Sequence, residues 1–129
     1  MGAPANRLPR VLKRAAVFVI SAGVTCAFII NLCALVYGCG CHSWWNGAAD
    51  SCNIHDEEAH HCPWCSIGAV GFYSVEAAIL AIQAVLSFGP WPRSIARNMA
   101  LRLLASLAAF PIVGSLIGIA LGLHSGYWN

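Results

Sequence analysis

Three long apolar stretches constrain this chain most, because each can cross a lipid bilayer as a helix. Residues 15–37 carry no charged side chain, and at about 1.5 Å per residue they can cross a hydrocarbon core of ~30 Å. Residues 66–88 and 103–123 are the other two stretches. Charged residues make up 9% of the chain, against about 25% in soluble domains. We therefore predict an all-α membrane protein with three transmembrane helices in a single domain, residues 1–129.

The distribution of basic residues predicts how these helices are oriented. All seven Lys and Arg residues lie before the first stretch or in the connection 89–102. Basic residues favour the cytoplasmic side of a membrane. We therefore expect the N-terminus and the 89–102 connection in the cytoplasm, and the 38–65 loop and C-terminus outside it, in a bacterial inner membrane or plasma membrane. The first stretch exceeds the 7–15 apolar residues of a signal peptide, so we expect a retained helix.

Because the basic residues flank the membrane and form no patch, nucleic-acid binding is not predicted.

Two polar residues interrupt the second stretch, Glu76 and Gln83. A charge near the bilayer centre costs ~2.5–3.5 kcal/mol on insertion scales, so such residues need partners or a function. The functional interpretation is a proton relay, an ion relay or a quinone contact. The structural interpretation is a hydrogen bond that joins helices. Candidate partners on the first stretch are Ser21, Thr25 and Asn31.

Glycines recur every fourth residue in the third stretch, at Gly114, Gly118 and Gly122. A ridge of small residues lets a second helix approach closely in lipid. The partner is either another helix of this chain, a second copy in a homo-oligomer, or another membrane subunit.

The loop between the first two stretches concentrates the residues with metal-binding chemistry. Five of the seven cysteines and four of the five histidines fall between residues 39 and 65. Cys52-x2-His55 and Cys62-x2-Cys65 are two pairs whose spacing lets both members reach one ion, and two pairs complete a tetrahedral site. Thiolate and imidazole ligands favour zinc or copper. Alternate ligands are Cys39, Cys41, His42, His60 and His61.

Disulfide bonds are the structural alternative for these cysteines, because thiols tend to pair in an oxidising compartment. Disulfide bonds that merely hold the loop together explain Cys39, Cys41 and Cys52, but they do not explain the histidines in the same loop. Cys26 and Cys33, within the first stretch, are interpreted as small apolar filler, as membrane cysteines usually are. The alternative is a metal path toward Cys39 and Cys41, similar to the one that paired membrane cysteines provide in bacterial mercuric-ion transporters.

Thiol–disulfide exchange is the third interpretation of the loop. Cys62-Pro63-Trp64-Cys65 precedes the second stretch, where a helix N-terminus lowers a thiol pKa. In these four residues and their placement the chain resembles bacterial membrane disulfide-forming quinone reductases and vitamin K epoxide reductase. The resemblance implies Cys62 and Cys65 as a quinone-facing redox pair, with Cys39 and Cys41 as a shuttle pair. Those families use a four-helix core, whereas this chain has three stretches.

Together these patterns predict a small accessory or metal-handling subunit whose extracytoplasmic loop binds a soft metal ion and docks on a larger membrane complex. The alternative is a membrane thiol–disulfide oxidoreductase. Whether the protein is an enzyme stays open at this level.

Overall fold

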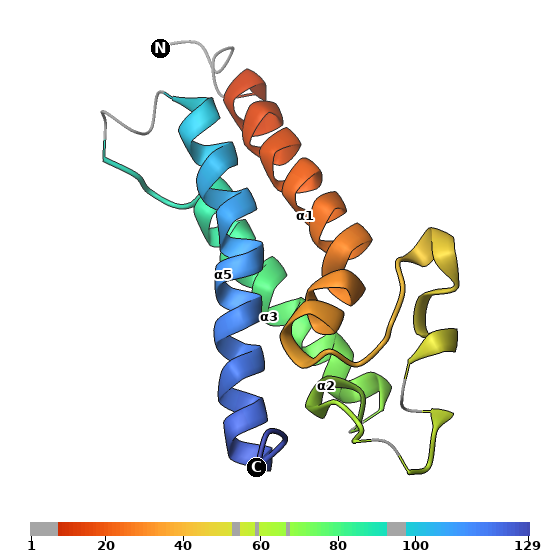
Figure 1. Ribbon diagram of the computed structural model, residues 1–129. Coiled ribbons are helices and arrows are strands. Elements are labelled where there is room, and N and C mark those ends of the chain that lie inside the picture. The colour runs from red at the N-terminus through yellow and green to blue at the C-terminus, as the bar shows by residue number, and fades with distance from the viewer. Residues whose placement is uncertain (1–7, 53–54, 59, 67, 93–97) are drawn as a thin grey trace, which may run out of the picture.

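The structure, a computed structural model, describes residues 8–52, 55–58, 60–66, 68–92 and 98–129. Within these ranges the long elements are three helices, α1 (Leu8–Tyr37), α3 (Ala69–Phe88) and α5 (Met99–Ser125) (Figure 1). Each is long and apolar enough to cross a membrane, and the 18-residue apolar windows within them have mean hydropathy of 2.3, 1.8 and 2.2 in turn. The predicted all-α fold with three spans is confirmed, and the cysteine-rich segment lies between α1 and α3.

Two of the helices begin earlier than the apolar stretches did. Hydropathy identifies only the part of a helix that crosses lipid, so the predicted spans began at residues 15 and 103. Basic residues such as Arg14 and Arg102 nevertheless lie inside α1 and α5. Arginine and lysine are good helix formers, so a helix continues through them. The Asn98 side chain caps α5 by accepting hydrogen bonds from the backbone N–H groups of Ala100 and Leu101.

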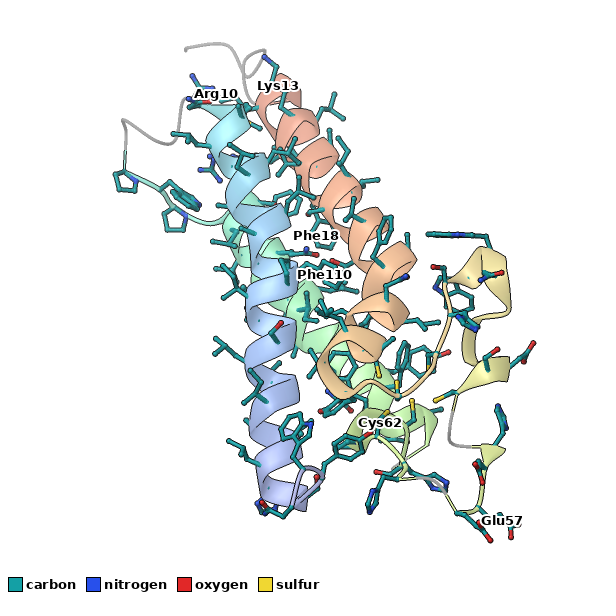
Figure 2. The ribbon with its side chains drawn as sticks, in the orientation of Figure 1. Arg10, Lys13, Phe18, Glu57, Cys62 and Phe110 are labelled. Atoms are coloured by element: carbon teal, nitrogen blue, oxygen red, sulfur yellow. The ribbon has the colours of Figure 1, made fainter. Side chains whose placement is uncertain are left out.

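The three helices form one bundle in which each packs against the other two. α1 and α5 run in the same direction and α3 runs opposite to them (Figure 1). Figure 2 shows Arg10 and Lys13 at one end of the bundle and Glu57 at the other. This segregation of charge agrees with the orientation expected from the sequence, which stays a prediction. Arg7, Arg93 and Arg97 lie outside the described residues.

The segment between α1 and α3 folds back along the side of α1. Asn31 Nδ2 donates a hydrogen bond to Ser43 Oγ at 2.8 Å, and Trp44 Nε1 donates one to the Cys26 carbonyl at 2.9 Å. The sequence placed this segment in a loop beyond the helices, but these contacts bring its first half alongside the second half of α1. Its short elements are η2 (Trp44–Asn46), η3 (Ala48–Ser51) and α2 (Pro63–Ser66).

Gly114, Gly118 and Gly122 are buried in α5. A Cβ at Gly114 would collide with Leu32 Cδ2, and one at Gly118 would lie 3.0 Å from Val36 Cγ1. Both contacts are with α1, so the close approach predicted for this ridge occurs within the chain. An additional contact through these glycines with a second copy stays a prediction.

A layer of fully buried polar side chains joins the helices toward the end that carries the basic residues. Gln83 Nε2 donates to Thr25 Oγ1 at 2.8 Å and to the Ser106 carbonyl at 3.0 Å, and lies 3.5 Å from the Ser21 carbonyl. Ser21 and Thr25 were candidate partners in the sequence. We call this set the polar layer; its members are Ser21, Thr25, Gln83, Ser87, Arg102 and Ser106.

Arg102 of the polar layer closes the last turn of α3. Its guanidinium donates to the Ser87 carbonyl at 2.9 Å, the Leu86 carbonyl at 3.2 Å and the Gly89 carbonyl at 3.3 Å. The last carbonyls of a helix have no partner within it and carry partial negative charge. A buried cation at this end is therefore matched by the α3 terminus.

Glu76 is half-buried, outside the polar layer, and its side chain interacts with Cys26 of α1. Its role as a relay or a quinone contact stays a prediction.

Candidate metal centre

Six cysteine sulfurs gather where α1 ends and α3 begins. They form two groups in which all three Sγ atoms lie within 4.8 Å of one another. We call them the first triad (Cys33, Cys62 and Cys65) and the second triad (Cys39, Cys41 and Cys52). The first triad draws its members from α1 and from the turn before α3, so tertiary packing creates it.

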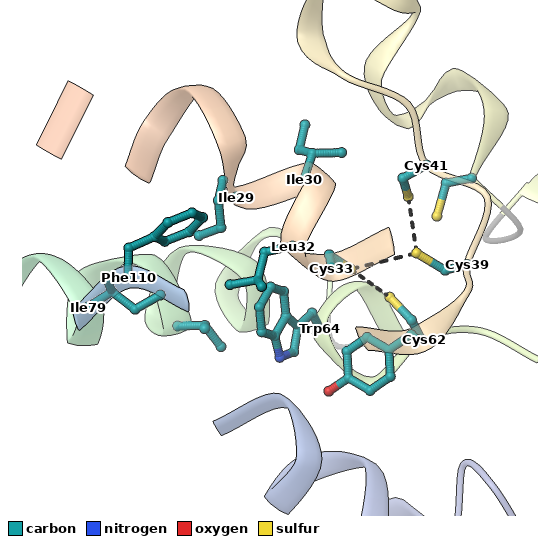
Figure 3. Close-up of a cluster of buried hydrophobic side chains, with 13 residues drawn as sticks. Ile29, Ile30, Leu32, Cys33, Cys39, Cys41, Cys62, Trp64, Ile79 and Phe110 are labelled. Carbon is teal, nitrogen blue, oxygen red and sulfur yellow. Dashed lines mark hydrogen bonds between the residues drawn. The ribbon is translucent and has the colours of Figure 1, made fainter. Parts of the chain in front are cut away.

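The separations between sulfurs fit a shared metal ligand set. Cys33 Sγ lies 3.5 Å from Cys62 Sγ, and Cys39 Sγ lies 3.5 Å from Cys41 Sγ (Figure 3). A disulfide requires about 2.05 Å. Sulfur ligands about 2.3 Å from a tetrahedral zinc ion lie about 3.8 Å apart, which is close to the separations seen here.

Two glycines bring the second triad against the end of α1. Gly38 and Gly40 have φ of +63° and +74°, a left-handed conformation that residues other than glycine adopt at a cost. The chain therefore turns sharply after α1, so that the Cys39 sulfur points back toward Cys33 at 3.7 Å. A Cβ on Gly40 would also lie 3.1 Å from the Ser51 carbonyl.

The Cys62–Cys65 motif forms a tight turn that opens α2. The backbone N–H groups of Cys65 and Ser66 donate to the Cys62 carbonyl at 3.0 and 2.9 Å. Pro63 is the first residue of α2, a position where the missing N–H costs nothing. Trp64 is fully buried and lies against Gly118 of α5, which fixes the turn on the bundle.

Burial and thiol contacts make the sulfurs unlike one another. All are buried except Cys65, which is half-buried. Hydrogen bonds from the Cys33 and Cys62 thiols lower the pKa of Cys65 to about 4, and hydrogen bonds from Cys33 and Cys39 lower the pKa of Cys62. Burial raises the pKa of Cys41. Negative charge is thus favoured on Cys65, and a charge there opposes a second one on Cys62.

The structure divides the four ligands named from spacing. Cys52 belongs to the second triad, and Cys62 and Cys65 belong to the first. The His55 side chain is exposed and, with Cys33, Cys41, Cys52 and Cys65, lines a cavity of ≈300 Å³. That one ion takes Cys52, His55, Cys62 and Cys65 together stays a prediction.

The other loop histidines are exposed, and in the described part of the chain neither triad includes a histidine. The His60 ring lies 6.3 Å from the Tyr127 ring. His61 Nε2 lies 3.0 Å from the Asp56 carbonyl oxygen. His42 has a backbone hydrogen bond to Ala48. Cys39 and Cys41, also alternates in the sequence, do lie in a triad.

Cys33 is the triad member that the filler interpretation set aside, because a cysteine inside an apolar helix resembles filler. Its position on the last turn of α1, six residues before Cys39, was the available signal. Cys26, by contrast, is exposed on α1 and lies outside both triads.

Comparisons with protein-family models, curated proteins and solved structures found no match to this chain. On its own sequence and structure, the chain is a three-span membrane protein with two buried cysteine triads that could hold metal ions.

Proposed function

We propose that this protein binds a soft metal ion, zinc or copper(I), at the cysteine triads and acts as a metal-handling subunit of a membrane assembly. The observation that carries the proposal is the convergence of six sulfurs from separate parts of the chain. Thiolates select soft cations over calcium or magnesium. In the predicted orientation, the site would sit at the extracytoplasmic end of the helices.

The charge distribution supports this proposal. The sequence from 38 to 65 contains no Lys or Arg, and Arg10 and Lys13 lie at the opposite end of the bundle. Buried thiolates need a compensating positive charge. A bound cation would supply that charge where the described side chains near the sulfurs do not.

Metal analysis of the purified protein tests this function. The chain is purified in detergent under reducing, chelator-free conditions, and its zinc and copper content is measured with a count of reactive thiols. We expect at least one ion per chain and protected thiols. The Cys62→Ser variant should lose at least half of the metal, whereas Cys26→Ser, outside the triads, should retain it. Failure to bind either metal, with all thiols reactive or oxidised, would overturn the proposal.

Thiol–disulfide exchange is the second candidate, and the ≈300 Å³ cavity favours it. Its walls are mostly apolar, with Ile30 and Phe72 among them, and Cys33 and Cys65 also line it. Two thiols would lose two electrons and two protons to a lipophilic quinone in the cavity, giving one disulfide and a hydroquinone. Under this candidate, a reducible Cys62–Cys65 bridge forms, no metal binds, and His55→Ala leaves exchange almost unchanged.

A further inference from the structure

The two triads are in contact with each other. Cys33 Sγ of the first triad lies 3.7 Å from Cys39 Sγ of the second. This separation nearly equals the 3.5 Å found within each triad. Figure 3 shows the resulting path of sulfur contacts from Cys62 through Cys33 and Cys39 to Cys41. We call the six sulfurs together the six-sulfur cluster.

A triad alone leaves a tetrahedral ion one ligand short, because structural zinc sites have four. Cys39 is the sulfur of the second triad in contact with the first, and Cys33 is the sulfur of the first triad in contact with the second. If each ion takes its missing ligand from the other triad, both ions share Cys33 and Cys39. The geometry is then two tetrahedra with a common edge.

We propose, building on the metal-binding function above, that the six-sulfur cluster is one dinuclear site for two divalent ions of the zinc class. Cys33 and Cys39 are the bridging thiolates. Cys62 and Cys65 complete the ligand set of one ion, and Cys41 and Cys52 complete that of the other. Each thiol releases its proton to solvent when it becomes a ligand.

Charge favours divalent ions in this site. Six thiolates carry a formal charge of −6, so two divalent ions leave −2 and two monovalent ions leave −4. Buried net charge is costly, and Cys33, Cys39 and Cys62 are each no more than 1% exposed. All ligand positions are filled by sulfur, so the exposed loop histidines are not required.

Cadmium binding tests the bridge directly on the unmodified chain. The protein is purified in detergent, reduced, stripped of metal and titrated with ¹¹³Cd²⁺. We expect two Cd²⁺ per chain and two ¹¹³Cd resonances in the all-thiolate region, each split by the other through the shared sulfurs. Two unsplit resonances, or one ion per chain, would overturn the dinuclear site.

Variants then assign the bridges. Cys33→Ser and Cys39→Ser should each lower the stoichiometry from two ions to one or none and abolish the splitting, whereas Cys26→Ser should keep both. The splitting is measured without any substitution, so a variant that fails to fold does not decide the outcome. A chain that takes Cu⁺ but no Cd²⁺ or Zn²⁺ overturns the dinuclear site and leaves metal handling intact. A chain that takes no metal overturns both.

Discussion

The two ends of the bundle are joined by different chemistry. In the polar layer, Gln83 and Arg102 donate hydrogen bonds to oxygen acceptors at 2.8–3.3 Å. In the six-sulfur cluster the nearest partners of Cys33 are other sulfurs at 3.5 and 3.7 Å. Thiols are weak donors and weak acceptors. The hydrogen-bonding groups of the polar layer thus find most of their partners within the protein. The sulfurs have only weak partners there, and the metal ion proposed above would stabilise that end more.

Withdrawal of metal should produce the largest effect and act only on the sulfur end. A ligand at 1,000 times its dissociation constant stabilises a protein by about 4 kcal/mol. We therefore expect zinc to raise the unfolding temperature in detergent and a chelator to reverse the gain. Cys26→Ser should respond like the unmodified chain and Cys62→Ser should not. Equal responses from both variants would contradict the comparison between the two ends.

Replacement of Arg102 should produce the largest effect at the polar end. Arg102→Met removes the donor to the Leu86, Ser87 and Gly89 carbonyls and should lower the free energy of unfolding by about 3 kcal/mol. Arg10→Ala, at an exposed position near the same end, should change it by less than ~0.5 kcal/mol. Denaturant titration in detergent measures both. Loss of metal from folded Arg102→Met protein would show that the two ends are coupled.

Gly114, between the polar layer and the six-sulfur cluster, tests the close packing of α5 on α1. Gly114→Ala places a Cβ against Leu32 of α1, and overpacking of this kind costs about 1–3 kcal/mol. Leu116→Ala, at a 64% exposed side chain on the same helix, is the matched control and should be close to neutral. Unfolding free energies of the two variants provide the measurement, and equal values would mean that α5 does not pack here as described.

The smallest effect is expected at Gln83. Gln83→Leu loses the hydrogen bonds to Thr25 and Ser106, but it also removes a buried Oε1 without a hydrogen-bond partner in the described part of the chain. Hydrogen bonds between membrane helices average about 0.6 kcal/mol, so we expect a loss of that order with metal binding unchanged. A loss as large as that of Arg102→Met would mean that Gln83 holds the polar layer together.

The sequence was sufficient for the helices and insufficient for the site. Uncharged stretches of membrane-crossing length predict spans directly, because the bilayer imposes that length. The metal ligands expected from the sequence rested on spacing within the loop, and that spacing cannot reveal that α1 contributes Cys33 to a triad. Cys39 reaches Cys33 because the chain reverses at Gly38 and Gly40, and Cys62 reaches Cys33 because Trp64 packs on α5. These are tertiary contacts, and local pattern does not encode them.

α5 contributes no sulfur, yet its Gly118 contacts Tyr37 and Trp64, which are neighbours of the triad cysteines in the chain. The Tyr37 hydroxyl, on the last residue of α1, donates to the Gly118 carbonyl at 2.7 Å, and the Tyr127 hydroxyl donates to the Tyr37 carbonyl at 3.0 Å. The last residues of the chain therefore brace the turn that carries Cys39. An affinity tag joined at Asn129 would begin two residues from Tyr127 and disturb the hydrogen bond that holds this turn. A purification tag is therefore better placed ahead of α1.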